Sequence, residues 1–336
     1  MEKSNLMKID KNLMHETYDQ WPEIAKTSYE SIQNPVECKE IDNIVFCGMG
    51  GSGTLSDFFA SILSKTNIHV SIVKGYHLPH TADSKTLVIS TSVSGNTLET
   101  LSVLNSALNK KCQTISFSNG GKMEEFCKKK KIPHRRIPMH NSPRASFPAY
   151  LYSMLKILYP VIPVKITDIK ESFNFLDNFQ KNISSKNIQN GNKALELASW
   201  ITNVPMIYYP WGLQTAATRF KNSLQENTKM HVMSEEIMEA CHNGIVCWER
   251  PTNIKPIFIR GEDDFVKTKE RWGIFKEFFH EKNIEYKEII SVKGSILSKM
   301  ICLIYFLDYV SIYRAILSEI DPTPVKSIEF IKSKIK

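Results

Sequence analysis

Residues 48–53 read Gly-Met-Gly-Gly-Ser-Gly and directly follow a short apolar run at 43–47. Glycines let the backbone turn tightly and present its N–H groups to an anion, and a helix beginning there adds its positive dipole end. The spacing departs from the GxGxxG of dinucleotide-binding loops, and the next strand ends in Lys74 and Gly75 rather than an acidic residue. No Gly-Lys-Ser/Thr follows, so the pattern is not a Walker loop.

A second loop, Ser-Val-Ser-Gly-Asn-Thr at 92–97, follows the apolar run 87–90 and opens a helical pattern at 98–108. Its hydroxyls can donate to phosphate oxygens, although Ser94 or Thr97 could also serve as a simple N-cap. Ligands bind at the carboxyl ends of strands in open α/β sheets. Two such loops predict a site for a single phosphate monoester rather than a dinucleotide.

Strand, turn and helix alternate along both halves of the chain, which predicts parallel sheets covered by helices on both faces. The fold class is therefore α/β, with two tandem doubly wound domains. The predicted strands are 43–47, 69–73, 87–90, 114–117, 204–209, 256–260 and 286–290, and the main predicted helices are 98–108, 145–158, 216–227, 266–280, 296–317 and one after Pro324.

The 336 residues suit two domains of ordinary size. We expect an N-terminal helical segment at 1–40, a first, phosphate-binding domain at 41–160, and a second domain with C-terminal helices at 192–336. The stretch 161–191 is rich in Asn, Lys and Ser and is predicted to be a linker that is helical in part.

Composition is that of a globular protein, with 42% apolar and 23% charged residues. We expect a cytoplasmic protein: there is no secretory signal, no apolar run of roughly 18–20 residues, and the seven cysteines form no CxxC pair. The net charge of +8 owes much to 128–131, 135 and 136, which we interpret as a solvated helix end rather than a nucleic-acid surface. No HxH, HExxH or paired-cysteine spacing occurs, so neither a metal nor another cofactor is expected.

The two loops, together with Pro-Arg-Ala-Ser-Phe at 143–147, resemble the sugar isomerase (SIS) fold. Within it, the chain from about residue 40 to its end is similar to the bifunctional phosphoglucose/phosphomannose isomerases best known from archaea. The resemblance implies that the substrate phosphate contacts Gly51, Ser52, Ser92, Ser94 and Thr97.

The segment 219–229 resembles the stretch around the catalytic base of this family, and the matching carboxylate is Glu226. A base poised near neutral pH needs partial desolvation to raise its pKa, so we expect Glu226 in a cleft. The alternative is a solvated glutamate at a helix end beside Lys229. Gln225 departs from the asparagine of the family pattern.

Residues 241–246, Cys-His-Asn-Gly-Ile-Val, resemble the family sequence HNEIVGW. The resemblance makes His242 the ring-opening group, and its ordinary pKa near physiological pH suits that task. In the family this histidine is supplied across a dimer interface, which implies a homodimer. Gly244 and Cys247 replace a glutamate and a glycine of the pattern.

Arg144, in the 143–147 motif, is the expected cation beside the reacting carbons, with a structural role as the alternative. The C-terminal segment 321–332 resembles the family's closing helix, which carries a lysine near the sugar ring. Lys332 matches best by its distance from the chain end, and Lys326 is the rival. Thr323 is a weaker candidate for shaping the space around C2.

The resemblance, together with these residues, implies a metal-independent isomerase that interconverts glucose 6-phosphate and fructose 6-phosphate through a cis-enediolate, with mannose 6-phosphate as a second substrate. One alternative is a regulator that binds sugar phosphate without catalysis, which would need the serine loops but not Glu226, His242 and Arg144 together. The other is an SIS isomerase for a different sugar phosphate. No nucleic-acid or membrane partner is expected.

Overall fold

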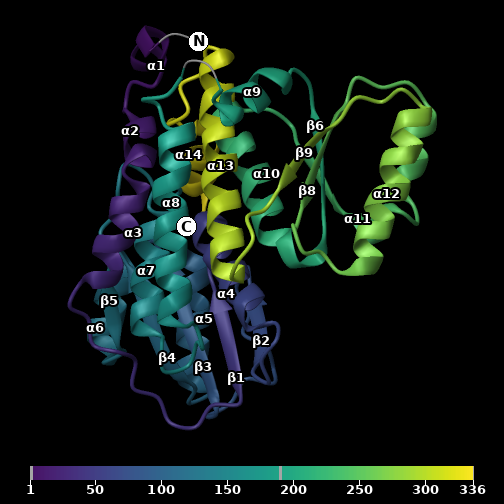
Figure 1. The fold of residues 1–336 in the computed structure, drawn as a ribbon. Helices are drawn as coiled ribbons and strands as arrows, with labels where there is room; N and C mark the ends of the chain where they lie inside the picture. The colour runs from purple at the N-terminus through teal and green to yellow at the C-terminus, as the bar shows by residue number, and fades with distance from the viewer. Residues whose placement is uncertain (1–2, 189–190, 336) are drawn as a thin grey trace. The chain divides into compact units, whose positions relative to one another are not determined.

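The computed structural model describes residues 3–188 and 191–335, which form two compact units (Figure 1). One unit comprises residues 20–173, and the other comprises residues 1–19 together with 174–336. The start of the chain therefore belongs with its C-terminal half. Helix α8, Ile166–Ile183, occupies most of the segment expected as a linker, and the division between the units falls within it.

The unit of residues 20–173 contains a five-stranded parallel sheet in the order β2-β1-β3-β4-β5. Its strands are β1 Asn43–Cys47, β2 His69–Val73, β3 Thr86–Ser92, β4 Gln113–Ser118 and β5 His134–Arg136. The first four match the predicted runs, and β3 is buried along its whole length. The sequence analysis missed β5 because its three residues carry no apolar pattern.

Helices α3 Trp21–Glu30, α4 Gly50–Leu63, α5 Leu98–Asn109, α6 Gly121–Lys130 and α7 Phe147–Ile157 accompany this sheet. Helix α7 is buried on nearly all sides, and α3 packs on it. The Trp21 ring stacks on Phe147 with 6.3 Å between ring centroids, and its Nε1 donates to Ala145 O at 2.9 Å. These contacts fix the segment before α7, which carries Arg144.

The other unit contains a four-stranded parallel sheet in the order β7-β6-β8-β9. Its elements are α1 Lys3–Ile9, α2 Met14–Asp19, α9 Lys193–Trp200, β6 Pro205–Tyr209, α10 Gln214–Thr228, β7 Met233–Glu236, α11 Ile237–Ala240, β8 Lys255–Arg260, α12 Val266–Glu281, β9 Lys287–Ile290, α13 Ile296–Leu317 and α14 Lys326–Lys334. Strand β7 reads Met-Ser-Glu-Glu, and this short polar stretch gave no strand signal.

Helix α13 spans 22 residues and is long and apolar enough to cross a membrane, although polar residues such as Asp308 interrupt its apolar runs. Of its most apolar window, 83% is buried inside the protein, as expected of a core helix. The seven cysteines are free thiols, four of them buried.

The two parallel sheets flanked by helices confirm the predicted α/β class.

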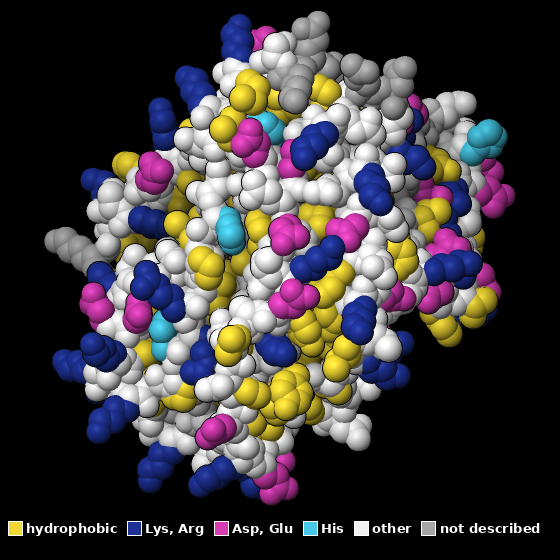
Figure 2. All heavy atoms as spheres, turned by 60° about the vertical axis from the view of Figure 1, so that its left-hand side comes forward, with side chains coloured by type: hydrophobic (Ala, Val, Ile, Leu, Met, Phe, Trp, Pro, Cys, Tyr) yellow, Lys and Arg dark blue, Asp and Glu magenta, His cyan; other side chains and the backbone are white. Residues whose placement is uncertain are grey.

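The basic cluster lies at the end of α6, where Lys128, Lys129 and Lys130 form the last turn and are exposed. Cations at a helix C-terminus interact favourably with the helix dipole. On the face shown in Figure 2, basic side chains are interspersed with acidic and apolar ones. The exposure of these lysines and their position at the helix C-terminus agree with a solvated helix end.

Candidate active site

The first glycine-rich loop joins β1 to α4 as the sequence predicts. A Cβ added at Gly48 would lie 2.6 Å from Ser52 O, so only glycine allows this close turn. Met49 occupies the N-cap position of α4 and has no side-chain oxygen to cap the first N–H groups of the helix. The start of α4, at Gly51 and Ser52, therefore has no side-chain cap and presents a positive dipole end that suits an anion.

The second loop contains the end of β3 and the start of α5. Ser92 Oγ lies 2.8 Å from Thr97 Oγ1 and accepts a hydrogen bond from Gly95 N at 3.1 Å. Ser94 Oγ accepts from Asn96 N at 3.3 Å. Thr97 is at the N-cap of α5, but its hydroxyl bonds Ser92 and not a backbone N–H of the helix. The hydroxyls of Ser92 and Thr97 thus bond each other, that of Ser94 accepts from the loop backbone, and Thr97 does not act as a side-chain N-cap.

The two loops meet at the same edge of the sheet. Strands β1 and β3 are neighbours, with Cys47 opposite Ser90, so both loops leave the sheet at its carboxyl edge. Val93 N donates to Ser52 Oγ at 3.3 Å, which links the loops directly. The segments 48–53 and 92–97, which hold the five predicted phosphate-binding residues, therefore adjoin. We call these two segments the phosphate cradle.

A third loop, after β4, supports the cradle and was missed by the sequence analysis. Met123 N donates to Gly95 O at 2.8 Å, and Asn119 N donates to Val93 O at 3.1 Å. Gly95 has a φ of +69°, and a Cβ added there would lie 1.7 Å from Gly120 O. The available signal was the run Asn-Gly-Gly at 119–121, another turn at a strand end.

Arg144 lies in the turn before α7 and is only 6% exposed. Helix α7 is tied to the cradle because the single proton of the Tyr150 hydroxyl has two acceptors, Ile137 O at 3.0 Å and Val93 O at 3.4 Å. Burial raises the pKa of Tyr150, which keeps the hydroxyl protonated as a donor. The motif containing Arg144 is thus anchored to the same edge of the sheet as the cradle.

Lys74, at the end of β2, is a cation near the first loop that the sequence analysis did not select. Its Nζ lies 2.6 Å from Asp57 Oδ2, and its Cε lies 3.4 Å from the position of a Cβ added at Gly53. Burial raises the pKa of Asp57, while the hydrogen bond and charge of Lys74 act in the opposite direction. This pair links α4 to the end of β2.

Glu226 lies near the C-terminal end of α10 and is half-buried, in the other unit. Lys229 follows as the C-cap in the left-handed conformation, with φ of +60°. Its ammonium donates to Glu226 O at 2.5 Å and also contacts Pro322 O at 3.4 Å. The lysine expected beside Glu226 therefore binds the backbone at the end of its helix.

His242 is exposed in the turn after α11, and Lys332 and Lys326 are exposed on α14, which has no buried residue. The structure explains the glycine at position 244, because a Cβ there would lie 2.1 Å from Glu235 Oε2. A carboxylate from β7 thus occupies the space where the family pattern has a glutamate side chain. Glu226, His242 and the two lysines stand on three separate elements of this unit.

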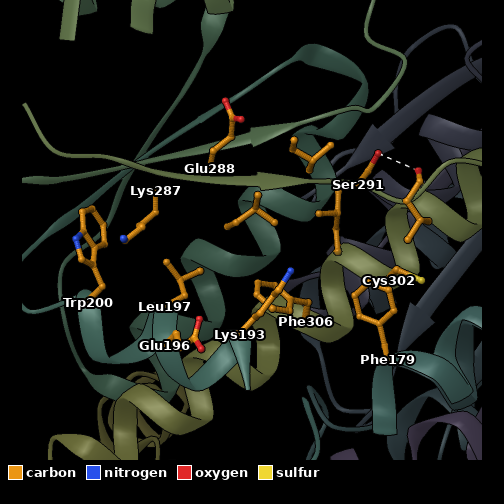
Figure 3. A pocket seen from close by; sticks show the side chains of 14 residues that line it. Phe179, Lys193, Glu196, Leu197, Trp200, Lys287, Glu288, Ser291, Cys302 and Phe306 are labelled. Carbon is orange, nitrogen blue, oxygen red and sulfur yellow. Dashed lines mark hydrogen bonds between the residues drawn. The ribbon is translucent and has the colours of Figure 1, made fainter. Parts of the chain in front are cut away.

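A cavity of about 650 Å³ in the same unit lies between β9, α9 and α13 (Figure 3). Trp200, Leu197 and Phe306 give it a largely apolar wall, and Ser291 Oγ donates to Val292 O at its side at 3.1 Å. Glu226, His242 and Lys332 are not among its lining residues. Within residues 3–188 and 191–335, no group of three or more His, Cys, Asp or Glu could hold a metal ion.

Comparison with known proteins shows the fold class and the family of the chain. The family model described as "Bacterial phospho-glucose isomerase C-terminal SIS domain" matches residues 190–335. Two solved structures share the fold: a hypothetical protein of Thermus thermophilus (TM-score 0.70, 12% identity, covering 98% of this chain and 88% of that one) and tagatose-6-phosphate ketose/aldose isomerase of Escherichia coli (TM-score 0.65, 12% identity, 96% and 93%). The chain is an SIS-type α/β protein.

Curated relatives are closer in sequence. The bifunctional phosphoglucose/phosphomannose isomerase of Caldicellulosiruptor bescii is 34% identical over 96% of this chain and 98% of its own, and that of Aquifex aeolicus is 29% identical over 94% of each. D-glucosamine-6-phosphate 4-epimerase of Sulfolobus acidocaldarius is 28% identical over 69% of this chain and 72% of its own. The chain belongs to the bifunctional phosphoglucose/phosphomannose isomerase family, and the resemblance stated from its motifs is confirmed.

Proposed function

We propose that this protein is an aldose–ketose isomerase that interconverts glucose 6-phosphate and fructose 6-phosphate, with mannose 6-phosphate as a second substrate, and that it needs no metal or other cofactor. The observation that carries the proposal is the phosphate cradle, in which two hydroxyl-rich loops adjoin at neighbouring strand ends. A dianionic phosphate suits such a site because hydroxyls, backbone N–H groups and two helix starts all favour negative charge.

The chemistry would proceed by proton transfer once the phosphate is held. His242, helped by Lys332, opens the sugar ring by moving a proton between the ring oxygen and the C1 hydroxyl. Glu226 removes the proton from C2, the electron pair forms the C1–C2 double bond, and the C1 carbonyl electrons move to O1 to give the enediolate. The hydroxyl proton then passes from O2 to O1, and the same carboxyl returns its proton to C1 as the C2 carbonyl forms. The guanidinium of Arg144 stabilises the negative charge that develops on oxygen.

We further propose a cytoplasmic homodimer in which the partner supplies His242 to each site. The support is the family resemblance around residues 241–246, together with the exposure of His242, which leaves it available to a second copy. Sedimentation equilibrium would test the oligomeric state. Mixing an inactive His242→Ala protein with an inactive Glu226→Gln protein should restore part of the activity if the two residues act across an interface.

The central test is Glu226→Gln, which keeps the shape of the side chain and removes its basicity. We expect turnover of all three sugar phosphates to fall by about a thousandfold, since general-base catalysis contributes roughly 10²–10⁴. The KM for fructose 6-phosphate and the melting temperature should stay near their native values. Glu277→Gln, an exposed glutamate of α12, is the control and should retain full activity.

The assay should couple fructose 6-phosphate formation from each aldose phosphate to a dehydrogenase and be repeated after treatment with EDTA. Full activity after chelation supports the metal-independent mechanism, and strong inhibition contradicts it. Tight binding of sugar phosphate without turnover would instead indicate the regulator. Because one relative is named a D-glucosamine-6-phosphate 4-epimerase, glucosamine 6-phosphate belongs in the same substrate panel.

A further inference from the structure

A row of buried polar side chains runs along one face of α10. Arg219, Ser223 and Asn227 are spaced four residues apart, so they lie above one another on the helix, and each is at most 2% exposed. All three bond to α13, which lies beside α10 (Figure 1). Their partners there are Asp308 and Ser311, each 0% exposed.

Asp308 is the centre of this row. Its Oδ2 accepts from Arg219 Nη2 at 2.7 Å and from Nε at 3.2 Å, while its Oδ1 accepts from Ser223 Oγ at 2.6 Å. The Tyr18 hydroxyl adds a fourth hydrogen bond at 3.2 Å. One turn further along α10, Asn227 Nδ2 donates to Ser311 Oγ at 2.8 Å. The carboxylate is thus surrounded by donors in the middle of an apolar helix.

A buried ion pair contributes little to stability by itself, since removing two charges from water costs about as much as their attraction returns. What it does provide is a defined register. Apolar helices could slide or rotate on one another with little loss, whereas a shift of α10 by one turn, about 5.4 Å, would break every bond of this row at once. The pair therefore fixes the axial position of helix α10 relative to helix α13.

The register of α10 on α13 sets the position of Glu226. It precedes Asn227 and lies two turns beyond Arg219 on the same side of α10. The charge of Glu226 also acts on the guanidinium: burial alone would lower the pKa of Arg219, but Asp308, Tyr18 and Glu226 raise it above its ordinary value. Arg219 therefore stays charged, paired with the buried aspartate and influenced by the charge of the half-buried glutamate.

We propose that Arg219 and Asp308 are positioning residues that hold Glu226 at the distance from the substrate carbons that proton transfer needs. This inference rests on the proposed role of Glu226 as the base. Neither residue has to touch the substrate, because each acts through the placement of α10. A displacement of the base by about 1 Å can cost roughly a hundredfold in rate.

The test replaces both charges by apolar side chains of similar size, Arg219→Met together with Asp308→Leu, so that no buried charge is left without its partner. We expect a kcat lower by about tenfold to a hundredfold and a KM within about threefold of native, because the cradle is untouched. The hydroxyls of Ser223 and Tyr18 lose their acceptor, so the melting temperature is measured to check that the variant is folded. A double variant with native kcat would overturn the inference.

A milder variant covers the case in which the double variant does not fold. Ser223→Ala removes one hydrogen bond to Asp308 and should lower kcat by about threefold to tenfold with little change in KM. Tyr313→Phe is the matched control. Tyr313 is buried like Ser223 but lies on α13, and its hydroxyl donates to Ile183 O at 2.6 Å and not to α10, so kcat should stay native. Native kcat in Ser223→Ala, or an equal loss in Tyr313→Phe, contradicts a positioning role.

The outcomes also separate this inference from the proposed function. If Glu226→Gln is inactive while the double variant is fully active, Glu226 is the base and the ion pair is only structural. If Glu226→Gln keeps its activity, the base has been assigned wrongly, and the positioning role falls with it.

Discussion

The phosphate cradle and the Glu226 region differ in how far their proposed site residues are buried and hydrogen-bonded within their own unit. The cradle's two loops hydrogen-bond to each other and to a third loop, and Ser52 and Ser92 are at most 5% exposed. In the other unit Glu226 is half-buried, and His242 and Lys332 are exposed on separate elements. The proposed phosphate-binding residues are thus held by hydrogen bonds within one unit, whereas two of the proposed acid–base residues, His242 and Lys332, are exposed.

This difference has a physical reason. A phosphate can be bound by backbone N–H groups and hydroxyls, which remain neutral when buried, provided that they bond one another in the empty site. Catalytic carboxylates and lysines are charged, and burying them without a partner is costly. We therefore expect substitutions in the cradle to affect stability and KM, and substitutions of the exposed groups to affect kcat alone.

Gly95→Ala should have the largest effect and would test whether the cradle is rigid. The new Cβ would lie 1.7 Å from Gly120 O at a φ of +69°, so two backbone segments must separate. We expect a loss of roughly 3 kcal/mol in unfolding free energy. Calorimetric titration should find no binding of glucose 6-phosphate.

Gly50→Ala is the stability control for Gly95→Ala. Gly50 also has a positive φ, of +55°, but nothing lies within 4 Å of the added Cβ. It should cost only about 1 kcal/mol, the strain of the left-handed conformation. Equal losses in the two variants would mean that backbone strain, and not the contact between the loops, decides the stability of the cradle.

His242→Ala should give the next largest effect, and on kcat alone. The side chain is exposed, so the melting temperature should stay within about 1 °C of native, because surface substitutions rarely exceed roughly 0.5 kcal/mol. Loss of the ring-opening group should lower kcat by about a hundredfold. Steady-state kinetics and thermal unfolding on the same sample would check both, and a strong loss of stability would contradict the comparison.

Ser92→Ala should act mainly on KM. The substitution removes the hydroxyl that bonds Thr97 Oγ1 and accepts from Gly95 N. Loss of a hydrogen bond to a charged phosphate corresponds to about tenfold weaker binding. The KM for fructose 6-phosphate measures this effect. Ser106→Ala, further along α5, should leave the KM unchanged.

The smallest expected effect concerns Glu235, whose carboxylate fills the space beside Gly244. Burial, and then the charges of Glu239 and Glu236, raise the pKa of Glu235 above its ordinary value of 4.5. The folded protein then binds this proton more tightly than the unfolded chain does, so the stability contribution of Glu235 falls as pH rises above about 4.5.

Removing the charge of Glu235 tests whether its contribution to stability falls as the pH rises. Glu235→Gln should unfold at a higher temperature than native at pH 7, and the difference should become smaller toward pH 4, where native Glu235 is protonated. Differential scanning calorimetry at several pH values measures it. Glu281→Gln, at the exposed end of α12, should show no comparable trend. A variant that is less stable at pH 7 would contradict the assignment.

Much of the fold could be predicted because buried parallel strands leave continuous apolar runs. β1 and β2 have the predicted bounds, and β8 and α12 differ from prediction by one residue. Strands β5 and β7 could not be found, since pairing along a neighbouring strand, and not local composition, places His134–Arg136 and Met233–Glu236 in a sheet. The assignment of residues 1–19 to the C-terminal half likewise depends on long-range packing.

The candidate site divides in the same way. The two loops of the cradle could be predicted from the sequence alone, because glycines and hydroxyls at strand ends favour particular local conformations. The motifs of the sequence also placed the chain in its family. Only the tertiary structure showed the support from 119–121, the space that Glu235 fills beside Gly244, and the pairing of Arg219 with Asp308. Those contacts join residues far apart in the chain, or depend on the room left by neighbouring side chains, and a linear pattern carries neither.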